Sequence, residues 1–503
     1  MAVVDQTPEP SVRGDMTAGR SGAPLSPAVS FVIVSTLAVL LPALLVVDVE
    51  NVGRSGAWVV TLGVMVWAGL RLSVLCINGR PSLFNYFFWL FVYIFMGLAP
   101  TAQMRADRPS TTTPDIEASQ DLRVALIVVL GIVCFEIGTV VAAARSSRRG
   151  GQHEEPQSRR QEVNRVRTVV LTVVGLAVTA YYISKIGLST QFSSREVAGA
   201  TRAAVWPDSA LRAIVYASAI YPSLVAAGAL AQIRWSHSKA WRRVGWIGLI
   251  LCTILLLLAV SPVASARYNF GTVAFALAVH YGAVRTRLRV QATMVGTLLA
   301  FLFVFPLVDV FRYAADSSGA TRSGFFDEYL GNADYDAFWQ IGNADLLWSE
   351  GVMTPLSQLS GSLLFWVPRS IWPDKPLDTG ILLAQSRGYI TQNLSAPMWA
   401  EGMVNGGFVG VVVLFLVLGY ALFRMDARLP EAFVVGGAWA IAGAVFPVYM
   451  TILLRGSWLQ ATGALIVATV CTLFVAGRRT DKPPPQPAQP GREATRRESF
   501  GPG

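Results

Sequence analysis

The sequence predicts an all-α polytopic membrane protein with about twelve transmembrane helices and one large external loop. Of its 503 residues, 53% are hydrophobic and only 14% are charged, and the mean hydropathy is +0.49. Uninterrupted apolar runs near the ~20 residues that a helix needs to cross a bilayer recur along the chain. Soluble globular domains do not combine these properties, so that class is excluded.

Apolar segments mark the predicted spans, and the fifth and eighth are the shortest of them. In chain order, the spans are expected at residues 29–47, 57–77, 83–100, 122–144, 168–184, 211–233, 244–261, 270–284, 291–308, 402–423, 433–453 and 457–476.

The two ends of the chain differ in composition from the spans. Residues 1–28 are rich in Pro, Gly and Ser, and residues 477–503 contain three consecutive prolines among scattered arginines. Such segments bury too little apolar surface to offset the entropy of ordering, so we expect both to be disordered. The transmembrane domain is expected over residues 29–476.

The arginines predict the orientation of the spans. Every even-numbered span is followed by a basic segment, whereas the odd-numbered spans are followed by mixed or acidic ones. By the positive-inside rule, both termini are cytoplasmic and the loop at about residues 309–401 is external. Because arginine far outnumbers lysine, as in GC-rich bacterial genomes, we expect the chain in the bacterial cytoplasmic membrane.

This external loop is the most informative part of the chain. A protein that lies mostly in the bilayer seldom carries so large a loop without a function for it. No ATP or sugar nucleotide is available on the external side. A reaction there requires a donor that has already crossed the membrane, such as one linked to a polyprenyl lipid.

Arg71 and Glu136 are ionisable residues that lie well inside predicted spans. A charge at the centre of a span costs about 2.5–3.5 kcal/mol on insertion scales, so such residues usually have a partner or a function. We favour a structural ion pair, or an Arg71 side chain that reaches toward the interface. A proton relay is the functional alternative.

Several basic residues fall on the predicted external side, where the positive-inside rule disfavours them. Guanidinium groups bind phosphate oxygens through paired hydrogen bonds and stay charged at physiological pH. If they converge, they form a diphosphate clamp, which we favour; alternatively, each pairs with a nearby acid such as Asp327 or Glu328. The residues are Arg195, Arg202, Arg267, Arg312, Arg322, Arg369, Lys375 and Arg387.

Residues 368–376 form a distinct segment of the loop. Prolines bracket the segment, so it is not continuous helix, and Trp372 suits the membrane interface. Interfacial anchoring accounts for the tryptophan but leaves Arg369 and Lys375, six residues apart, unexplained.

Glu401 is the strongest single candidate for a catalytic residue. It follows Trp399 closely, where the loop meets the tenth span. A carboxylate half-buried against aromatic rings can take a proton from a sugar hydroxyl. Alternatively, it complements the dipole of the helix it begins, which contributes about 0.5 kcal/mol.

Two acid-x-acid patterns are candidate metal sites. Asp48 and Glu50 lie in the first external loop, and Asp334 and Asp336 lie in the long one. Such a pair can hold a divalent cation against a phosphate. Neither has a histidine nearby and such pairs are common by chance, so we expect no metal. We also expect no cofactor and no nucleic-acid partner.

The order of residues from the long loop into the tenth span carries a resemblance to a known family. Residues 365–376 read FWVPRSIWPDKP and residues 401–410 read EGMVNGGFVG. This order resembles the O-antigen polymerase (Wzy-type) or oligosaccharide repeat-unit polymerase family. The pair Arg369 and Gly380, with ten residues between them, also matches a pattern of that family.

The resemblance implies a GT-C-like membrane glycosyltransferase that needs neither nucleotide sugar nor metal. It would polymerise polyprenyl-diphosphate-linked repeat units at the outer face, with inversion, alongside a flippase and a chain-length regulator. Glu401 would be the general base, and Arg369 would stabilise the leaving diphosphate. The residues expected to bind diphosphate or glycan are Arg195, Arg267, Tyr268, Arg312, Trp372, Lys375 and Asn405.

Three other functions remain as alternatives. A glycosyltransferase that uses polyprenyl-phosphate-linked sugars would employ Asp48 and Glu50 with a metal. A flippase or exporter of lipid-linked oligosaccharides would show repeat symmetry, which the sequence lacks. The related ligases generally use an outer-face histidine, whereas His153, His237 and His280 are all predicted at the cytoplasmic side.

Overall fold

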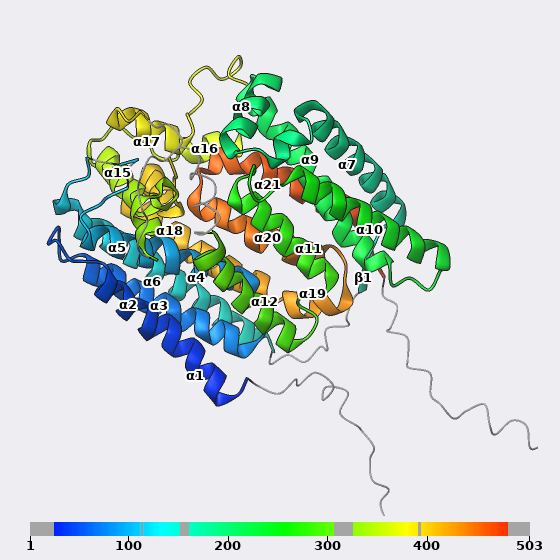
Figure 1. The fold of residues 1–503 in the computed structure, drawn as a ribbon, viewed down its shortest axis with the longest axis horizontal. Helices are drawn as coiled ribbons and strands as arrows, with labels where there is room; N and C mark the ends of the chain where they lie inside the picture. Colours follow the sequence, from blue (N-terminus) through cyan, green and yellow to red (C-terminus); the bar gives the residue numbers. More distant parts are fainter. Residues whose placement is uncertain are drawn as a thin grey trace, which may run out of the picture.

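The computed structural model describes residues 25–110, 112–113, 115–150, 160–305, 325–390 and 394–480. Within these residues the chain is helical apart from one pair of short strands, and the helices pack into one bundle (Figure 1). The predicted all-α class is confirmed. Of the ends predicted to be disordered, 1–28 and 477–503, residues 1–24 and 481–503 lie outside the described residues, as do Arg312 and Arg322. The described remainder is partly ordered, because α1 begins at Pro27 and residues 477–480 belong to a strand.

The first half of the chain forms helices and one strand. In order these are α1 (Pro27–Ser35), the π-helix η2 (Thr36–Leu40), α2 (Leu41–Asp48), α3 (Trp58–Asn78), α4 (Leu83–Phe91), the π-helix η3 (Val92–Leu98), α5 (Ala99–Arg105), α6 (Ala118–Gly150), β1 (Arg160–Val163), α7 (Arg165–Ile186), the 3-10 helix η4 (Ser189–Phe192), α8 (Arg195–Val205) and α9 (Ser209–Ile233).

The second half ends in the strand that pairs with β1. In order the elements are α10 (Lys239–Ala259), α11 (Arg267–Tyr281), α12 (Arg287–Leu299), the π-helix η5 (Ala300–Val304), α14 (Asp327–Gly331), the 3-10 helix η6 (Ala333–Tyr335), α15 (Ala337–Ser349), α16 (Ser357–Leu363), α17 (Thr379–Arg387), α18 (Met398–Asp426), α19 (Leu429–Val435), α20 (Ala438–Arg455), α21 (Trp458–Val475) and β2 (Ala476–Thr480).

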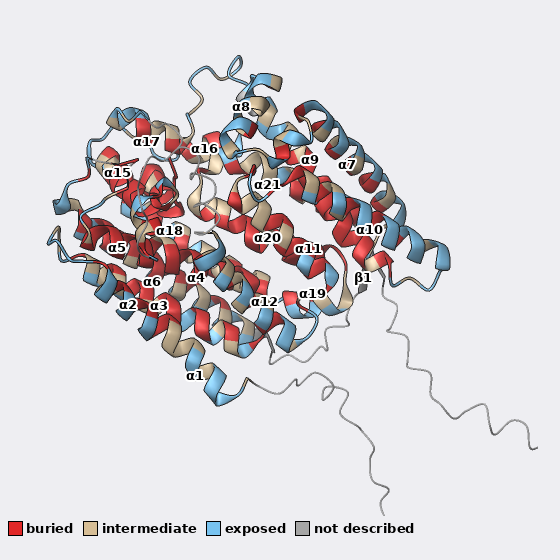
Figure 2. Ribbon diagram, viewed as in Figure 1, coloured by how far each residue is buried: buried red, intermediate tan, exposed pale blue. Residues whose placement is uncertain are grey.

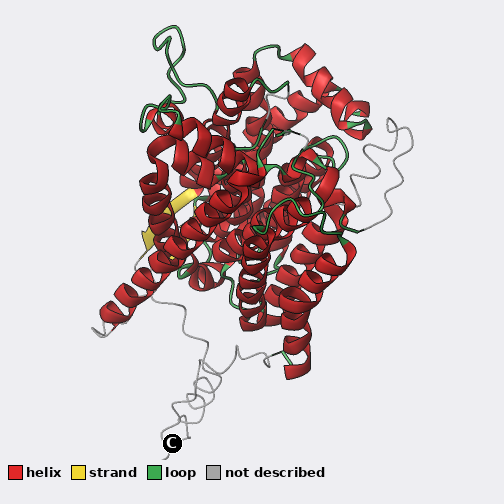
Figure 3. Ribbon diagram, turned by 90° about the vertical axis from the view of Figure 1, so that its left-hand side faces the viewer, coloured by secondary structure: helices red, strands yellow, loops and turns green. Residues whose placement is uncertain are grey.

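The two strands pair antiparallel at one end of the bundle (Figure 3). We call this the strand end. The opposite end, which carries α14 to α17, is called the loop end.

Eleven helical segments among the described residues are long and apolar enough to cross a membrane. The eighth predicted span, 270–284, is not one of them. Its helix, α11, has only 15 residues, about 22 Å, against a hydrocarbon core of about 30 Å. Gly282 ends this helix in the left-handed conformation with φ 105°. The sequence-based number of twelve therefore becomes eleven by this criterion.

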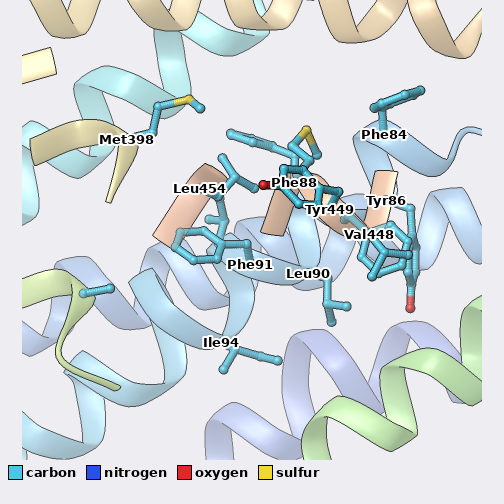
Figure 4. Close-up of a cluster of buried hydrophobic side chains, with 14 of the residues drawn as sticks. Phe84, Tyr86, Phe88, Leu90, Phe91, Ile94, Met398, Val448, Tyr449 and Leu454 are labelled. Atoms are coloured by element: carbon cyan, nitrogen blue, oxygen red, sulfur yellow. The ribbon is translucent and has the colours of Figure 1, made fainter. Parts of the chain in front are cut away.

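A central helix made of α4, η3 and α5 holds the bundle together. Phe88 and Phe91 of this helix lie in the buried core together with Tyr449 of α20 (Figure 4). The Phe88 and Phe135 rings stack with centroids 3.7 Å apart. Peripheral helices such as α1, α7 and α10 expose much of their surface instead (Figure 2), as expected for lipid-facing helices.

Several charged residues within the bundle have polar partners. Arg71 and Glu136 form a salt bridge between α3 and α6, which confirms the predicted structural pair. At the strand end, the carboxylate of Asp426 accepts hydrogen bonds from the backbone N–H groups of Phe84 and Asn85, both at 2.9 Å. The last residue of α18 thereby caps the first turn of α4, whose amides have no partner within that helix.

The chain reverses direction inside α18. At Gly406 and Gly407 the backbone leaves helical geometry, and Gly407 has φ 56°. The rings of Trp399 and Phe415 consequently lie 4.3 Å apart between centroids, although a continuous helix would separate these residues by about 24 Å. Residues 398–405 therefore form a short helix folded back against the rest of α18. The reversal falls inside the predicted span 402–423, which is not one continuous helix.

The described part of the predicted external loop is largely folded. Its longest helix, α15, is buried along most of its length. Polar residues of α15 have partners inside the bundle: Gln340 donates to the Thr113 hydroxyl at 2.7 Å, and Asp345 pairs with Arg123 on α6. The sequence predicted a loop here because α15 is too short to resemble a span.

Gly407→Ala tests the reversal in α18. An alanine Cβ at this position would meet the Trp348 indole nitrogen at 2.6 Å and would require a backbone conformation that L-residues rarely adopt. We expect a loss of about 1–3 kcal/mol in stability, measured by thermal unfolding in detergent. The control is Gly296→Ala in α12, where a Cβ meets nothing within 4 Å. Equal melting of the two variants would contradict the reversal.

Candidate functional site

Three arginines from distant parts of the chain meet at the loop end. Arg195 begins α8, Arg267 begins α11, and Arg455 ends α20. Because α11 starts where α20 ends, the two helices bring their arginines to the same level of the bundle. With their acidic partners we call them the arginine cluster; the acids are Glu328, Asp334 and Asp336.

Asp334 lies at the centre of the arginine cluster. Its Oδ1 is 3.1 Å from Nη2 of Arg455. Its Oδ2 is 3.7 Å from Nη2 of Arg267 and 4.0 Å from Nη1 of Arg195. The backbone carbonyl of Asp334 also accepts a hydrogen bond from Nε of Arg455 at 3.0 Å. One carboxylate therefore holds three guanidinium groups together.

The charges of the described residues of the cluster balance. Glu328 lies 3.6 Å from Arg267, and Asp336 lies 3.7 Å from Arg455. Three carboxylates thus face three guanidinium groups. The structure brings Arg195 and Arg267 together, as the clamp hypothesis requires, and it also gives them acidic partners, as the alternative requires. Arg267 is only 9% exposed, so without these acids its charge would be costly.

Two tyrosines complete the cluster. The hydroxyl of Tyr268 contacts Nη1 of Arg455. Tyr335 lies between Asp334 and Asp336 in the chain, and burial raises the pKa of its phenol well above the usual range. Tyr335 is therefore a neutral hydrogen-bonding group at any physiological pH.

An apolar cavity adjoins the cluster. Arg267, Tyr268, Asp334, Tyr335 and Arg455 form its polar side. Its enclosed space is narrow, about 30 Å³. Two π-helices, η3 and η5, contribute to the apolar wall, and helices of this type are frequent at functional sites. The wall consists of Leu90, Phe91, Ile94, Phe95, Phe301, Phe305 and Thr451.

Asp334 and Asp336, considered above as a metal site, both face Arg455. Asp336 also accepts hydrogen bonds from the Ser395 backbone N–H at 3.1 Å and the Thr112 hydroxyl at 3.3 Å. A guanidinium group therefore occupies the position between these carboxylates that the metal hypothesis gave to a cation.

Arg369 and Lys375 lie apart from the cluster, on an exposed turn. Arg369 donates to the carbonyl oxygens of Lys375, at 2.7 Å, and Pro376, at 3.1 Å. Lys375 donates to the carbonyl oxygens of Phe365 and Val367. Burial and the neighbouring Arg369 lower the pKa of Lys375. Both cations thus stabilise the turn by binding its carbonyl oxygens, which explains why they lie six residues apart. Trp372, on the same turn, is half-buried.

Glu401 lies on the folded-back helix and is fully buried. Its Oε1 accepts the backbone N–H of Trp458, the first residue of α21, at 2.9 Å, while its Oε2 has no hydrogen-bond partner within the described residues. Glu401 is not part of the cavity wall. Glu401 therefore caps a helix N-terminus, as the helix-dipole alternative expected. The helix that it caps is α21, however, and not the helix to which Glu401 belongs.

Asn405 joins the folded-back helix to α16. Its side chain accepts the backbone N–H of Leu359 at 2.8 Å and donates to the Glu401 carbonyl at 2.8 Å. Gly407, two residues on, lets the chain pass close to Trp348. The close approach after Asn405 is therefore made to a neighbouring residue of the protein.

Sequence reasoning missed Arg455, which contacts two acids of the cluster, Asp334 and Asp336. The signal was present, because Arg455 is a basic residue at the predicted external end of a span, where the positive-inside rule disfavours it.

Comparisons of the chain with protein-family models, curated proteins and solved structures gave no match.

Two substitutions of Glu401 separate a structural from a catalytic role. Glu401→Gln keeps an oxygen that can accept the Trp458 N–H, so it should lose less than about 1 kcal/mol of stability. Glu401→Ala removes the cap and should lose about 1–3 kcal/mol. Thermal unfolding in detergent measures both. If Glu401 is a general base, the Glu401→Gln variant makes no polymer although it is stably folded. If this variant makes polymer of wild-type length, the role of Glu401 is structural and not catalytic.

Proposed function

We propose that this chain is a GT-C-like membrane glycosyltransferase that polymerises polyprenyl-diphosphate-linked oligosaccharide repeat units at the outer face of the bacterial cytoplasmic membrane. The observation that carries the proposal is the arginine cluster. Buried guanidinium groups from α11 and α20 lie at the loop end of the bundle, directly beside an apolar wall. A polyprenyl diphosphate matches both features, because its diphosphate is anionic and its prenyl chain is apolar.

The cluster suits reversible binding of a diphosphate. Its arginines are held in position by Asp334, so little conformational entropy is lost when an anion arrives. The contacts of Arg267 at 3.6 and 3.7 Å are longer than charge-assisted hydrogen bonds of about 2.7–2.9 Å. Phosphate oxygens can therefore replace weak contacts with shorter, bidentate ones.

In the proposed reaction, an acceptor hydroxyl oxygen attacks the anomeric carbon of the donor sugar. The bond between that carbon and the phosphate oxygen breaks, and the polyprenyl diphosphate leaves with the electron pair. Arg267 and Arg455 stabilise the negative charge that develops on the leaving group. The hydroxyl proton passes to a base, and attack from the opposite face inverts the configuration.

Two carboxylates at the loop end, Glu401 and Asp334, are candidates for this base. Glu401, the sequence-based candidate, is enclosed between helices and does not line the cavity. Asp334 lines the cavity, but three arginines stabilise its ionised form and make it a weak base. The proposal therefore rests on the arginines, and the Glu401 variants decide whether that residue takes the proton.

Arg455→Lys tests the proposal. Lysine keeps the charge but cannot form the paired hydrogen bonds of a guanidinium group, so we expect product formation to fall about 100-fold or more. The assay incubates the purified protein with a polyprenyl-diphosphate-linked repeat unit and resolves the products by size. The control is Arg108→Ala, an exposed arginine of the loop end outside the cluster.

The outcomes of this assay separate the alternatives. A wild-type ladder from a stably folded Arg455→Lys variant would overturn the role of the cluster. Loss of the wild-type ladder on addition of EDTA would favour the metal-dependent enzyme that uses Asp48 and Glu50. Absence of any product from a competent substrate would favour a flippase or exporter.

A further inference from the structure

A second cavity opens at the strand end, far along the bundle from the arginine cluster. It lies among the ends of α9 and α11, the start of α20, and β1, and its volume is about 450 Å³. Figure 1 shows β1 and α19 side by side at this end. Neither the resemblance nor the proposed function assigns a role to this cavity.

The rim of the cavity is basic. Arg165, Arg285 and His237 line it and are exposed, and Glu162 is the one carboxylate among the described lining residues. The guanidinium carbon of Arg285 lies 4.9 Å from the centre of the Trp235 ring. Stacking on an indole holds a guanidinium group while leaving its N–H edge available to an anion.

The floor of the cavity contains an unsatisfied imidazole. His280 is only 8% exposed, and its Nε2 has no hydrogen-bond partner within the described residues. Gly228 makes room for the ring, because a Cβ there would lie 2.5 Å from His280 Cε1. Behind it, the buried Arg234 donates to the His280 carbonyl at 3.1 Å. A buried polar atom without a partner requires an explanation, and a ligand bound in the cavity would provide one.

A glycine turn borders the floor. Gly436 and Gly437, both with φ 88°, form a turn that leads into the N-terminus of α20. The Gln232 side chain clamps this turn, accepting the Gly437 N–H at 2.7 Å and donating to the Gly437 carbonyl at 3.1 Å. The Gly436 N–H donates to the Ala432 carbonyl at 2.8 Å, so both glycine amides have partners and the turn shapes the cavity wall without adding donors to it.

We propose that this cavity binds a phosphate-bearing anion on the cytoplasmic side of the membrane. Arg165 and Arg285 contribute guanidinium donors, and Nε2 of His280 accepts a hydrogen bond from a P–OH or alcohol hydroxyl group of the ligand. The ligand is either a soluble phosphate compound or the headgroup of an anionic lipid. Both present the same oxygens, and the site is open enough for either.

Binding of inorganic phosphate and retention of phosphatidylglycerol test the site. The full-length protein is purified in neutral detergent, and phosphate binding is followed by the phosphorus NMR line width at constant ionic strength. In parallel, native mass spectrometry counts phosphatidylglycerol retained after exchange from mixed micelles. We expect Arg285→Ala to weaken binding about tenfold or more, equivalent to one charge-assisted contact.

Arg243→Ala is the matched control, because it removes an exposed arginine of the strand end that does not line the cavity. His280→Gln is a second variant, and its melting temperature shows whether it folds. Saturable phosphate binding lost only in the cavity variants supports a soluble ligand, and retention of phosphatidylglycerol lost in the same variants supports a lipid. Absence of both, or equal loss in Arg243→Ala, overturns the proposal.

Discussion

The reversal of the chain at Gly406 and Gly407 is the constraint on which the loop end depends. It turns residues 398–405 back against α18 and so delivers Glu401 to the start of α21 and Asn405 to α16. The segment just before it supplies Ser395, which holds Asp336 in the arginine cluster. Only glycine tolerates the φ of 56° at Gly407 together with the close Trp348 ring, so one residue controls the geometry of the whole region.

Arginines at the two ends of the bundle differ in how many carboxylates lie near them. At the loop end, each guanidinium group of the arginine cluster has a carboxylate within 4.0 Å, so the buried charges neutralise one another. At the strand end, the cavity brings Arg165 and Arg285 beside an imidazole, with a single carboxylate among the described lining residues. The first arrangement allows exchange of one anion for another, whereas the second leaves positive potential that an added anion would neutralise.

Sequence reasoning about single residues succeeded where the partner was predictable and failed where it was not. Arg71 and Glu136 were expected to pair because an unpaired charge in a span is costly, and they do pair. Arg369 and Lys375 were placed with the other outer cations, yet they bind carbonyl oxygens of their own turn. Their spacing within a proline-bracketed segment was visible, but the path of the turn was not.

The sequence by itself determined the class of protein, because apolar runs long enough to span a bilayer and the placement of arginines are properties of local composition. It also located most of the spans within a few residues. Only the tertiary structure decided that Arg195, Arg267 and Arg455 share Asp334, and that Glu401 caps α21. These contacts join residues more than fifty positions apart, and their formation depends on how helices pack, which no local pattern encodes.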